Sequence, residues 1–136
     1  MSAKNNRGKV FFIKDKSGRE ISRIRIPDDP AILIRRCQQA KTDLDRSVFA
    51  ELKGIDIAAD GSADAEYAEI LRSAETEVHS VFDGLFGKRT GKRLFRTTRP
   101  FAAVGGRFFC AVMLDAIASG VRAEINKEIG EKHDER

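Results

Sequence analysis

Apolar positions along this chain alternate in one short N-terminal segment and recur at helical spacing in three longer ones. The N-terminal segment contains the β-forming run Val-Phe-Phe-Ile, and a second run places Ile24 and Ile26 on one face and arginines on the other. An Asp-Lys-Ser-Gly sequence between the runs suits a turn, because Asp favours its first position and Gly accepts positive φ. This pattern predicts a β-hairpin over residues 9–26.

The three longer segments predict amphipathic helices. Asp29 and Pro30 suit the start of the first helix, since Asp can cap free N–H groups and Pro fits the first helical position. Its apolar positions recur three or four apart as far as Gly54, which suits its end. Ser62 can cap the second helix, and Pro100 starts the third. The predicted helices span about residues 30–53, 63–83 and 100–125.

Together these elements predict a mainly α fold, in which an N-terminal β-hairpin is followed by three or four helices packed as a small bundle. The segment from Lys88 to Arg99 is expected to form a short helical turn, which would be the fourth helix, or a loop around Leu94 and Phe95. The length of 136 residues fits one domain. We place a single globular domain at 9–125, after a flexible arm at 1–8 and before a polar tail at 126–136.

The pair Gly105-Gly106 lies early in the third predicted helix. Each glycine costs about 1 kcal/mol relative to Ala inside a helix. The pair therefore indicates a kink, a delayed start of the helix, or a close contact with another backbone.

The cysteines and the longest apolar run bear on the compartment. Cys37 and Cys110 are far apart and each lies in an apolar stretch, which favours two buried thiols in a reducing cytoplasm over a disulfide. The first residues have no apolar run of the kind a signal peptide needs. The run Phe108–Ala118 is too short to cross a bilayer and is interrupted by Asp115. We therefore expect a cytoplasmic protein with no membrane association.

The sequence offers little catalytic or metal-binding chemistry. His79 has only Glu75 nearby at helical spacing, whereas zinc sites use three or four protein ligands. There is no Gly-x-Ser-x-Gly motif, and neither cysteine has a local partner to activate it. The segment from Gly84 to Lys92 is one residue shorter than a phosphate loop, has Arg93 in place of the Mg²⁺-binding Ser or Thr, and follows a helix. We expect no enzyme activity, no cofactor and no metal.

The charge distribution changes sign abruptly. Between Gly54 and Gly87 there are eight acids and one base, whereas between Lys88 and Leu114 there are seven bases and no acid. Six of these bases form a candidate basic patch: Lys88, Arg89, Lys92, Arg93, Arg96 and Arg99.

Three explanations of this basic patch remain open. It would bind nucleic-acid phosphates with salt-sensitive affinity, bind a protein partner, or neutralise the acidic surface of this chain or of a second copy. The chain has no RRM, zinc-finger or KH signature, and the neighbouring acidic helix would repel phosphates. We therefore rank nucleic acid behind a protein partner.

Around the charge reversal, the sequence resembles a known family. The segment Val81-Phe82-Asp83-Gly84-Leu85-Phe86-Gly87, with Thr90, Leu94 and Phe95 after it, is similar to the small tail assembly chaperones of long-tailed bacteriophages and prophages. Those proteins carry a Phe-Asp-x-Leu-Phe-Gly element after an acidic amphipathic helix, then a short Leu/Ile-Phe segment and a final helix. The similar region covers about residues 62–118. This chain differs in being basic overall, whereas many such chaperones are acidic.

The resemblance implies a helical, non-enzymatic protein that coats the tape measure protein in the host cytoplasm during tail assembly and often forms homo-oligomers. We expect it to bind this elongated helical partner through exposed apolar surface, in helix-in-groove contacts. The predicted partner-binding residues are Phe82, Leu85, Phe86, Leu94, Phe95, Phe101 and Phe108. Without the resemblance, the residues of the 82–95 corner are explained as a hydrophobic corner between two helices. The alternative function is a nucleic-acid-binding accessory protein that uses the basic segment 88–99.

Overall fold

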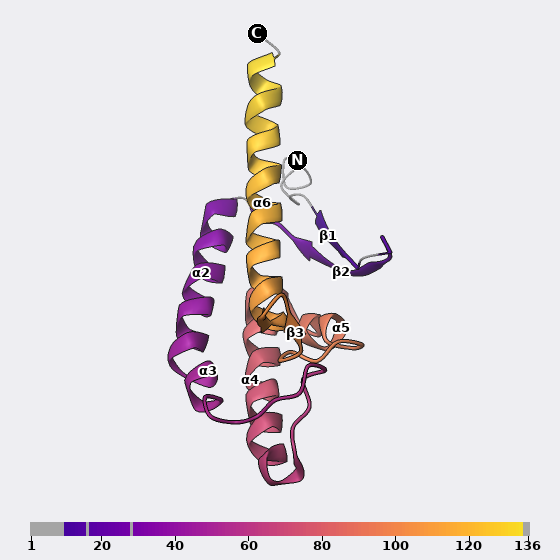
Figure 1. Ribbon diagram of the computed structural model, residues 1–136. Helices are drawn as coiled ribbons and strands as arrows, with labels where there is room; N and C mark the ends of the chain where they lie inside the picture. The colour runs from indigo at the N-terminus through magenta and orange to yellow at the C-terminus, as the bar shows by residue number, and fades with distance from the viewer. Residues whose placement is uncertain (1–9, 16, 28, 135–136) are drawn as a thin grey trace.

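The computed structural model describes residues 10–15, 17–27 and 29–134 and confirms the mainly α fold (Figure 1). About 58% of the chain is helical, and an N-terminal antiparallel hairpin precedes the helices. The predicted arm at residues 1–8 lies outside the described residues. No helix in the described part of the chain is long and apolar enough to cross a membrane.

The predicted hairpin forms from β1 (Val10–Lys14) and β2 (Glu20–Arg25). Two strands alone are marginally stable in water, so the hairpin needs a surface to lie on. It packs against two helices, α5 (Thr90–Leu94) and α6 (Phe109–Asp134). The ring of Phe11 lies on the backbone of α6 at Gly120, a position where any Cβ would collide with the ring.

The first long helix, α2 (Pro30–Arg46), is followed directly by the single turn α3 (Val48–Glu51). The Asp29 side chain accepts a hydrogen bond from the Ala31 N–H at 3.2 Å, as the predicted cap requires. The predicted helix at 30–53 is nevertheless broken at Ser47. The Ser47 hydroxyl donates to the carbonyl oxygen four residues earlier at 2.8 Å, a bond that favours bending of a helix.

The second long helix, α4 (Ala68–Phe86), begins five residues later than the predicted start at 63. Ser62 does not cap it, because its N–H and hydroxyl both donate to the Asp60 carboxylate at 2.9 and 2.6 Å. A 3₁₀ turn at Ala65–Tyr67 leads into the helix instead. The prediction of a helix was correct, but the capping residue was wrong.

The last helix begins at Phe109, nine residues after the predicted start at Pro100. The residues between them contain a small antiparallel hairpin, β3 (Ala103–Val104) with β4 (Arg107–Phe108). Gly105 and Gly106 form its turn with φ of 59° and 80°, values that suit the two-residue turns of tight hairpins. Of the three explanations for the glycine pair, the delayed start is therefore the one observed. Residues 126–134 of the predicted polar tail continue α6, and 135–136 lie outside the described residues.

Helices α2 and α6 pack along one another, and α2 also contacts α4 (Figure 1). Their inward faces and the inner face of the hairpin enclose one core. Its largest fully buried side chains are Phe82, Phe101, Ile24, Leu44, Leu114, Ile117, Val78, Val121, Cys37 and Cys110. Both cysteines are free and buried, as predicted.

Candidate functional site

The corner between α4 and α5 is part of the core. Phe82 is fully buried, and its ring meets that of Phe95 edge to face at 5.0 Å. Leu94 is 2% exposed and Phe95 is 8% exposed. The prediction that these three residues offer exposed partner-binding surface is therefore wrong, because their side chains are buried in the core. Leu85 and Phe86, at the end of α4, are only half-buried and contact the rim of this cluster.

Three residues of the same segment set the geometry of the corner. Gly87 ends α4 at φ 113° and ψ 159°, a conformation essentially restricted to glycine. The carboxylate of Asp83 accepts a hydrogen bond from the Gly91 N–H at 2.8 Å and so caps the start of α5 from another helix. Gly91 lies directly on α4, where an added Cβ would be 2.9 Å from the Cα of His79.

Sequence reasoning named Gly87 but missed the roles of Asp83 and Gly91. A capping side chain that comes from a neighbouring helix depends on tertiary packing, which no local sequence motif encodes. The segment resembling a phosphate loop has its first glycine inside α4 and Lys92 inside α5. It therefore lacks the open loop geometry that such a site needs, as predicted.

The predicted basic patch is exposed along α5 and its flanks. Arg99 forms a two-bond ion pair with Glu75 of α4, at 2.9 and 3.2 Å. This pair joins the basic segment to the acidic helix within one chain, as the neutralisation explanation requires. The ion pairs found between described residues include none of the other five cations: Lys88, Arg89, Lys92, Arg93 and Arg96. Neutralisation thus accounts for Arg99 only.

Phe101 and Phe108 lie together in a different place, an open cleft of about 470 Å³ between α2–α3 and the β3–β4 hairpin. Their rings meet edge to face at 5.0 Å, and the ring of Phe49 contacts both, at 6.2 and 5.2 Å. Phe101 is 1% exposed, so the prediction that it offers exposed partner-binding surface is also wrong, whereas Phe108 is half-buried beside the cleft. The cleft is lined by Lys41, Asp45, Phe49, Ile57, Ala58, Phe101, Ala103, Gly106, Arg107, Phe108 and Ala111.

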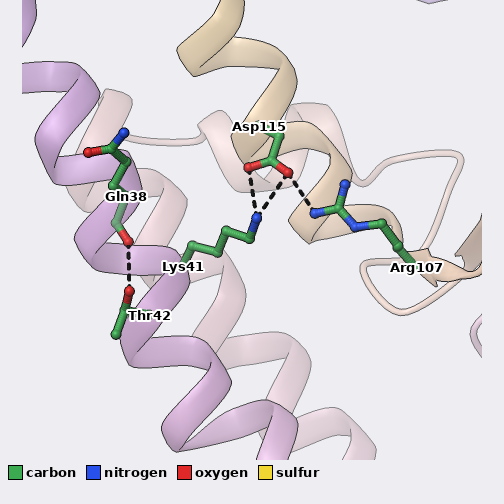
Figure 2. A network of polar contacts seen from close by, with 5 residues as sticks. All are labelled: Gln38, Lys41, Thr42, Arg107 and Asp115. Carbon is green, nitrogen blue, oxygen red and sulfur yellow. Dashed lines mark hydrogen bonds and ion pairs between the residues drawn. The ribbon is translucent and has the colours of Figure 1, made fainter.

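An ion-pair network beside this cleft joins its walls (Figure 2). The carboxylate of Asp115 on α6 accepts hydrogen bonds from Lys41 of α2 at 3.0 Å and from Arg107 of β4 at 2.6 Å. Burial by itself would raise the pKa of Asp115, but the hydrogen bonds from Arg107 and Lys41 outweigh it and lower that pKa. The charged carboxylate therefore stabilises the present spacing of α2, α6 and the β3–β4 hairpin.

Sequence reasoning found Phe101 and Phe108 and missed Phe49, Lys41 and Asp115. Phe49 follows a stripe residue of the first predicted helix, so its apolar character was a usable local signal. The ion pair between Lys41 and Asp115 joins residues 74 positions apart, for which the sequence carries no local signal.

The two cysteine side chains are held in environments that make them unreactive. Burial raises the pKa of the Cys37 thiol to about 11 and that of the Cys110 thiol to about 12, so both are protonated at neutral pH. A reactive cysteine needs the opposite shift. His79 lies against the ring of Phe95, with ring centroids 5.4 Å apart. Over the described ranges, no three His, Cys, Asp or Glu side chains gather closely enough to hold a metal ion.

Comparisons of this chain with protein-family models, curated proteins and solved structures found no match. The likeness to tail assembly chaperones therefore rests on the sequence of the 62–118 region, and what it implies about function is a proposal.

Proposed function

We propose that this chain is a non-enzymatic assembly chaperone of the phage-tail type, which binds an elongated helical partner of the tape measure kind. The observation that carries the proposal is the apolar cleft beside the β3–β4 hairpin. It contains the half-buried Phe108, one of the residues that the sequence marked for partner binding, packed against the buried Phe101.

The chemistry of the cleft suits the apolar face of an amphipathic helix. Phe49, Phe108 and Ile57 supply apolar surface, and the charged Lys41, Asp45 and Arg107 also line the cleft. Its volume lies within the range of roughly 300–1,000 Å³ found for small-molecule pockets, which is space enough for a few large side chains of a partner. Helix-in-groove recognition places a few large side chains of the partner, spaced three or four residues apart, in such a hollow.

The predicted partner-binding set thereby divides into two groups. Phe82, Leu94 and Phe95 pack the α4–α5 corner, and the partner binds in the cleft instead of at that corner. The half-buried Leu85 and Phe86 offer a second, smaller apolar contact at the end of α4.

A co-purification experiment tests the proposal. The chain is co-expressed with a long coiled-coil protein of the tape measure kind, and the complex is isolated through a tag on the coiled-coil protein. We expect the chain to co-purify with that protein and to keep it in solution. If the wild-type chain neither co-purifies nor raises the soluble yield, the proposed function is wrong.

A pair of matched variants locates the contact. Ala103→Arg places a long charged side chain in the cleft from an exposed strand position, whereas Ala116→Arg adds the same side chain to an exposed position of α6 outside it. We expect at least a tenfold loss of retained partner for the first variant and no loss for the second. Wild-type retention by Ala103→Arg would show that the partner binds elsewhere.

A further inference from the structure

The outer face of the β1–β2 hairpin is exposed and unusually apolar for its position. Phe12 is 46% exposed and Val10 is 44% exposed, although neighbouring residues of the same strand point into the core. The register places Phe12 opposite Arg23 and Val10 opposite Arg25. The guanidinium of Arg23 lies over the Phe12 ring, 5.4 Å from its centroid. Folding of the chain does not require these apolar side chains on this face.

The same face is cationic. Lys14 follows Phe12 on β1, and Arg23 and Arg25 alternate with buried residues on β2. Glu20 is the one acid of β2, and it pairs with Arg23 at 3.0 Å in a contact exposed to solvent. Such an exposed pair contributes little and is easily replaced by another anion.

Helix α5 extends this cationic surface. It packs against β2, with Thr90, Gly91 and Leu94 buried and its lysine and arginine side chains exposed. The helix that carries these cations therefore packs against the strand that carries Arg23 and Arg25. Two segments that are about seventy residues apart in sequence, and that both carry exposed cations, thus pack against one another (Figure 1).

Two acids of α4 lie on its α5 side and are already engaged: Asp83 accepts a hydrogen bond from the Gly91 N–H, and Glu75 pairs with Arg99. Helix α5 sits on α4 at His79, and Glu77 lies two positions earlier, hence about 160° around the helix axis. The repulsion of phosphates that sequence reasoning expected from this helix is thus directed to another side for Glu77 and offset by Arg99 for Glu75.

We propose that the outer face of the β1–β2 hairpin and the exposed cations of α5 form one binding surface for single-stranded nucleic acid. An exposed aromatic ring on a strand, with arginines beside it, gives unpaired bases a platform for stacking. The surrounding cations neutralise the phosphates that follow. The stacked pair of Phe12 and Arg23 supplies the platform, and Lys14, Arg25 and the α5 side chains line the backbone path.

This surface goes beyond the proposed chaperone function and shares no residue with the cleft. The test is fluorescence anisotropy with a labelled oligodeoxythymidylate of about 16 nucleotides, a length suited to small single-strand sites. Titrations run from about 50 to about 200 mM NaCl. We expect binding whose logarithm falls linearly with the logarithm of salt concentration, and weaker binding to a duplex of equal length. No binding at the lowest salt overturns the proposal, and equal affinity for the duplex overturns the stacking role.

Variants locate the site. Phe12→Ala should weaken binding by about fivefold to a hundredfold, the range found when a stacking aromatic is removed. Arg23→Gln with Arg25→Gln should lower the salt slope by about 1.4, since each single-strand contact contributes about 0.7. The matched control is Arg35→Gln with Arg36→Gln, which removes the same charge from exposed positions of α2 on the opposite side of α6 (Figure 1).

The α2 control separates a specific site from an effect of net charge, and a lipid titration separates nucleic acid from a membrane surface. Equal losses in the hairpin double variant and the α2 control would show that net charge alone drives binding and would overturn the site. Binding to anionic phosphatidylserine vesicles without binding to the oligonucleotide would assign the surface to a membrane instead. Circular dichroism of each variant confirms that the fold is retained. The cleft variant Ala103→Arg should bind the oligonucleotide like the wild type, so the two functions can fail separately.

Discussion

The close seating of α5 on α4 makes a quantitative prediction for Gly91→Ala. The added methyl group would lie 2.9 Å from the Cα, 3.1 Å from the Cβ and 3.1 Å from the carbonyl oxygen of His79. Non-bonded carbon atoms prefer about 3.5–4.0 Å, so α5 has to move outward by a substantial part of an ångström. Backbone atoms of a long helix cannot yield as the end of a side chain can. The movement would strain the Asp83–Gly91 hydrogen bond and loosen the contact between Phe82 and Phe95.

Gly84→Ala is the matched control for this variant. Gly84 lies in α4, and an added Cβ there meets nothing within 4 Å. Replacing an exposed helical Gly by Ala stabilises a protein by about 0.5–1 kcal/mol. Both variants gain some of this stabilisation, because both glycines lie in helices. Overpacking costs about 1–3 kcal/mol and applies to Gly91→Ala alone. We therefore expect Gly84→Ala to be more stable than the wild type and Gly91→Ala to be less stable.

Urea unfolding measures the difference. With a slope of about 1–3 kcal/mol per molar urea, the midpoints of the two variants should differ by on the order of 1 M. The slopes themselves should stay equal if both variants unfold in one step. If Gly91→Ala unfolds at the same urea concentration as Gly84→Ala, or at a higher one, then α5 does not press on α4 and the account of the corner is wrong.

Two further predictions concern the hairpin and the Asp115 network. Ser22 is 3% exposed, and its hydroxyl has no hydrogen-bond partner in the described part of the chain, so Ser22→Ala should raise the free energy of unfolding by up to about 1 kcal/mol; a clear loss would reveal a bonded hydroxyl. The lowered pKa of Asp115 gives stability that is present above its ordinary value of 3.8 and disappears as pH falls through the folded-state pKa. Asp115→Asn should thus unfold more easily than the wild type at pH 7, by about 1 kcal/mol or less for so exposed a network, and should equal it near pH 2; a gap that persists at low pH would refute this role.

The helices and strands of this fold were predictable wherever apolar residues recur along one face of the element. The hairpin and the cores of the three long helices follow from apolar spacing, and Asp29 caps α2 as its position indicated. The helix boundaries were less predictable because other groups compete for the same atoms. Asp60 takes both donors of Ser62, and Ser47 bonds backward to its own helix. Such local hydrogen bonds decide where a helix starts or breaks, and periodicity does not reveal them.

The glycine pair Gly105-Gly106 also shows that local sequence does not fix where a helix begins. Gly105-Gly106 marked an irregularity correctly, and its local sequence left three explanations open. The delayed start at Phe109 depends on contacts made elsewhere: the Ala103 N–H donates to the Ala59 carbonyl at 2.9 Å, and the Cys110 N–H donates to the Pro100 carbonyl. The first of these bonds fixes β3 against the loop before α4, and the second holds the start of α6, so a helix through 100–108 would forfeit them.

The candidate sites were predictable in their residue types but not in their grouping. A run that mixes Leu and Phe with six cations predicts a surface where both kinds of side chain meet a partner. In the structure the two kinds separate, because α5 buries Leu94 against the core and directs its cations outward beside β2. The proposed apolar recognition therefore rests on the cleft at Phe108, and the proposed electrostatic recognition rests on the surface around Arg23. This separation predicts that Ala103→Arg loses binding to the helical partner. The same variant should still bind the oligonucleotide, because its hairpin is intact.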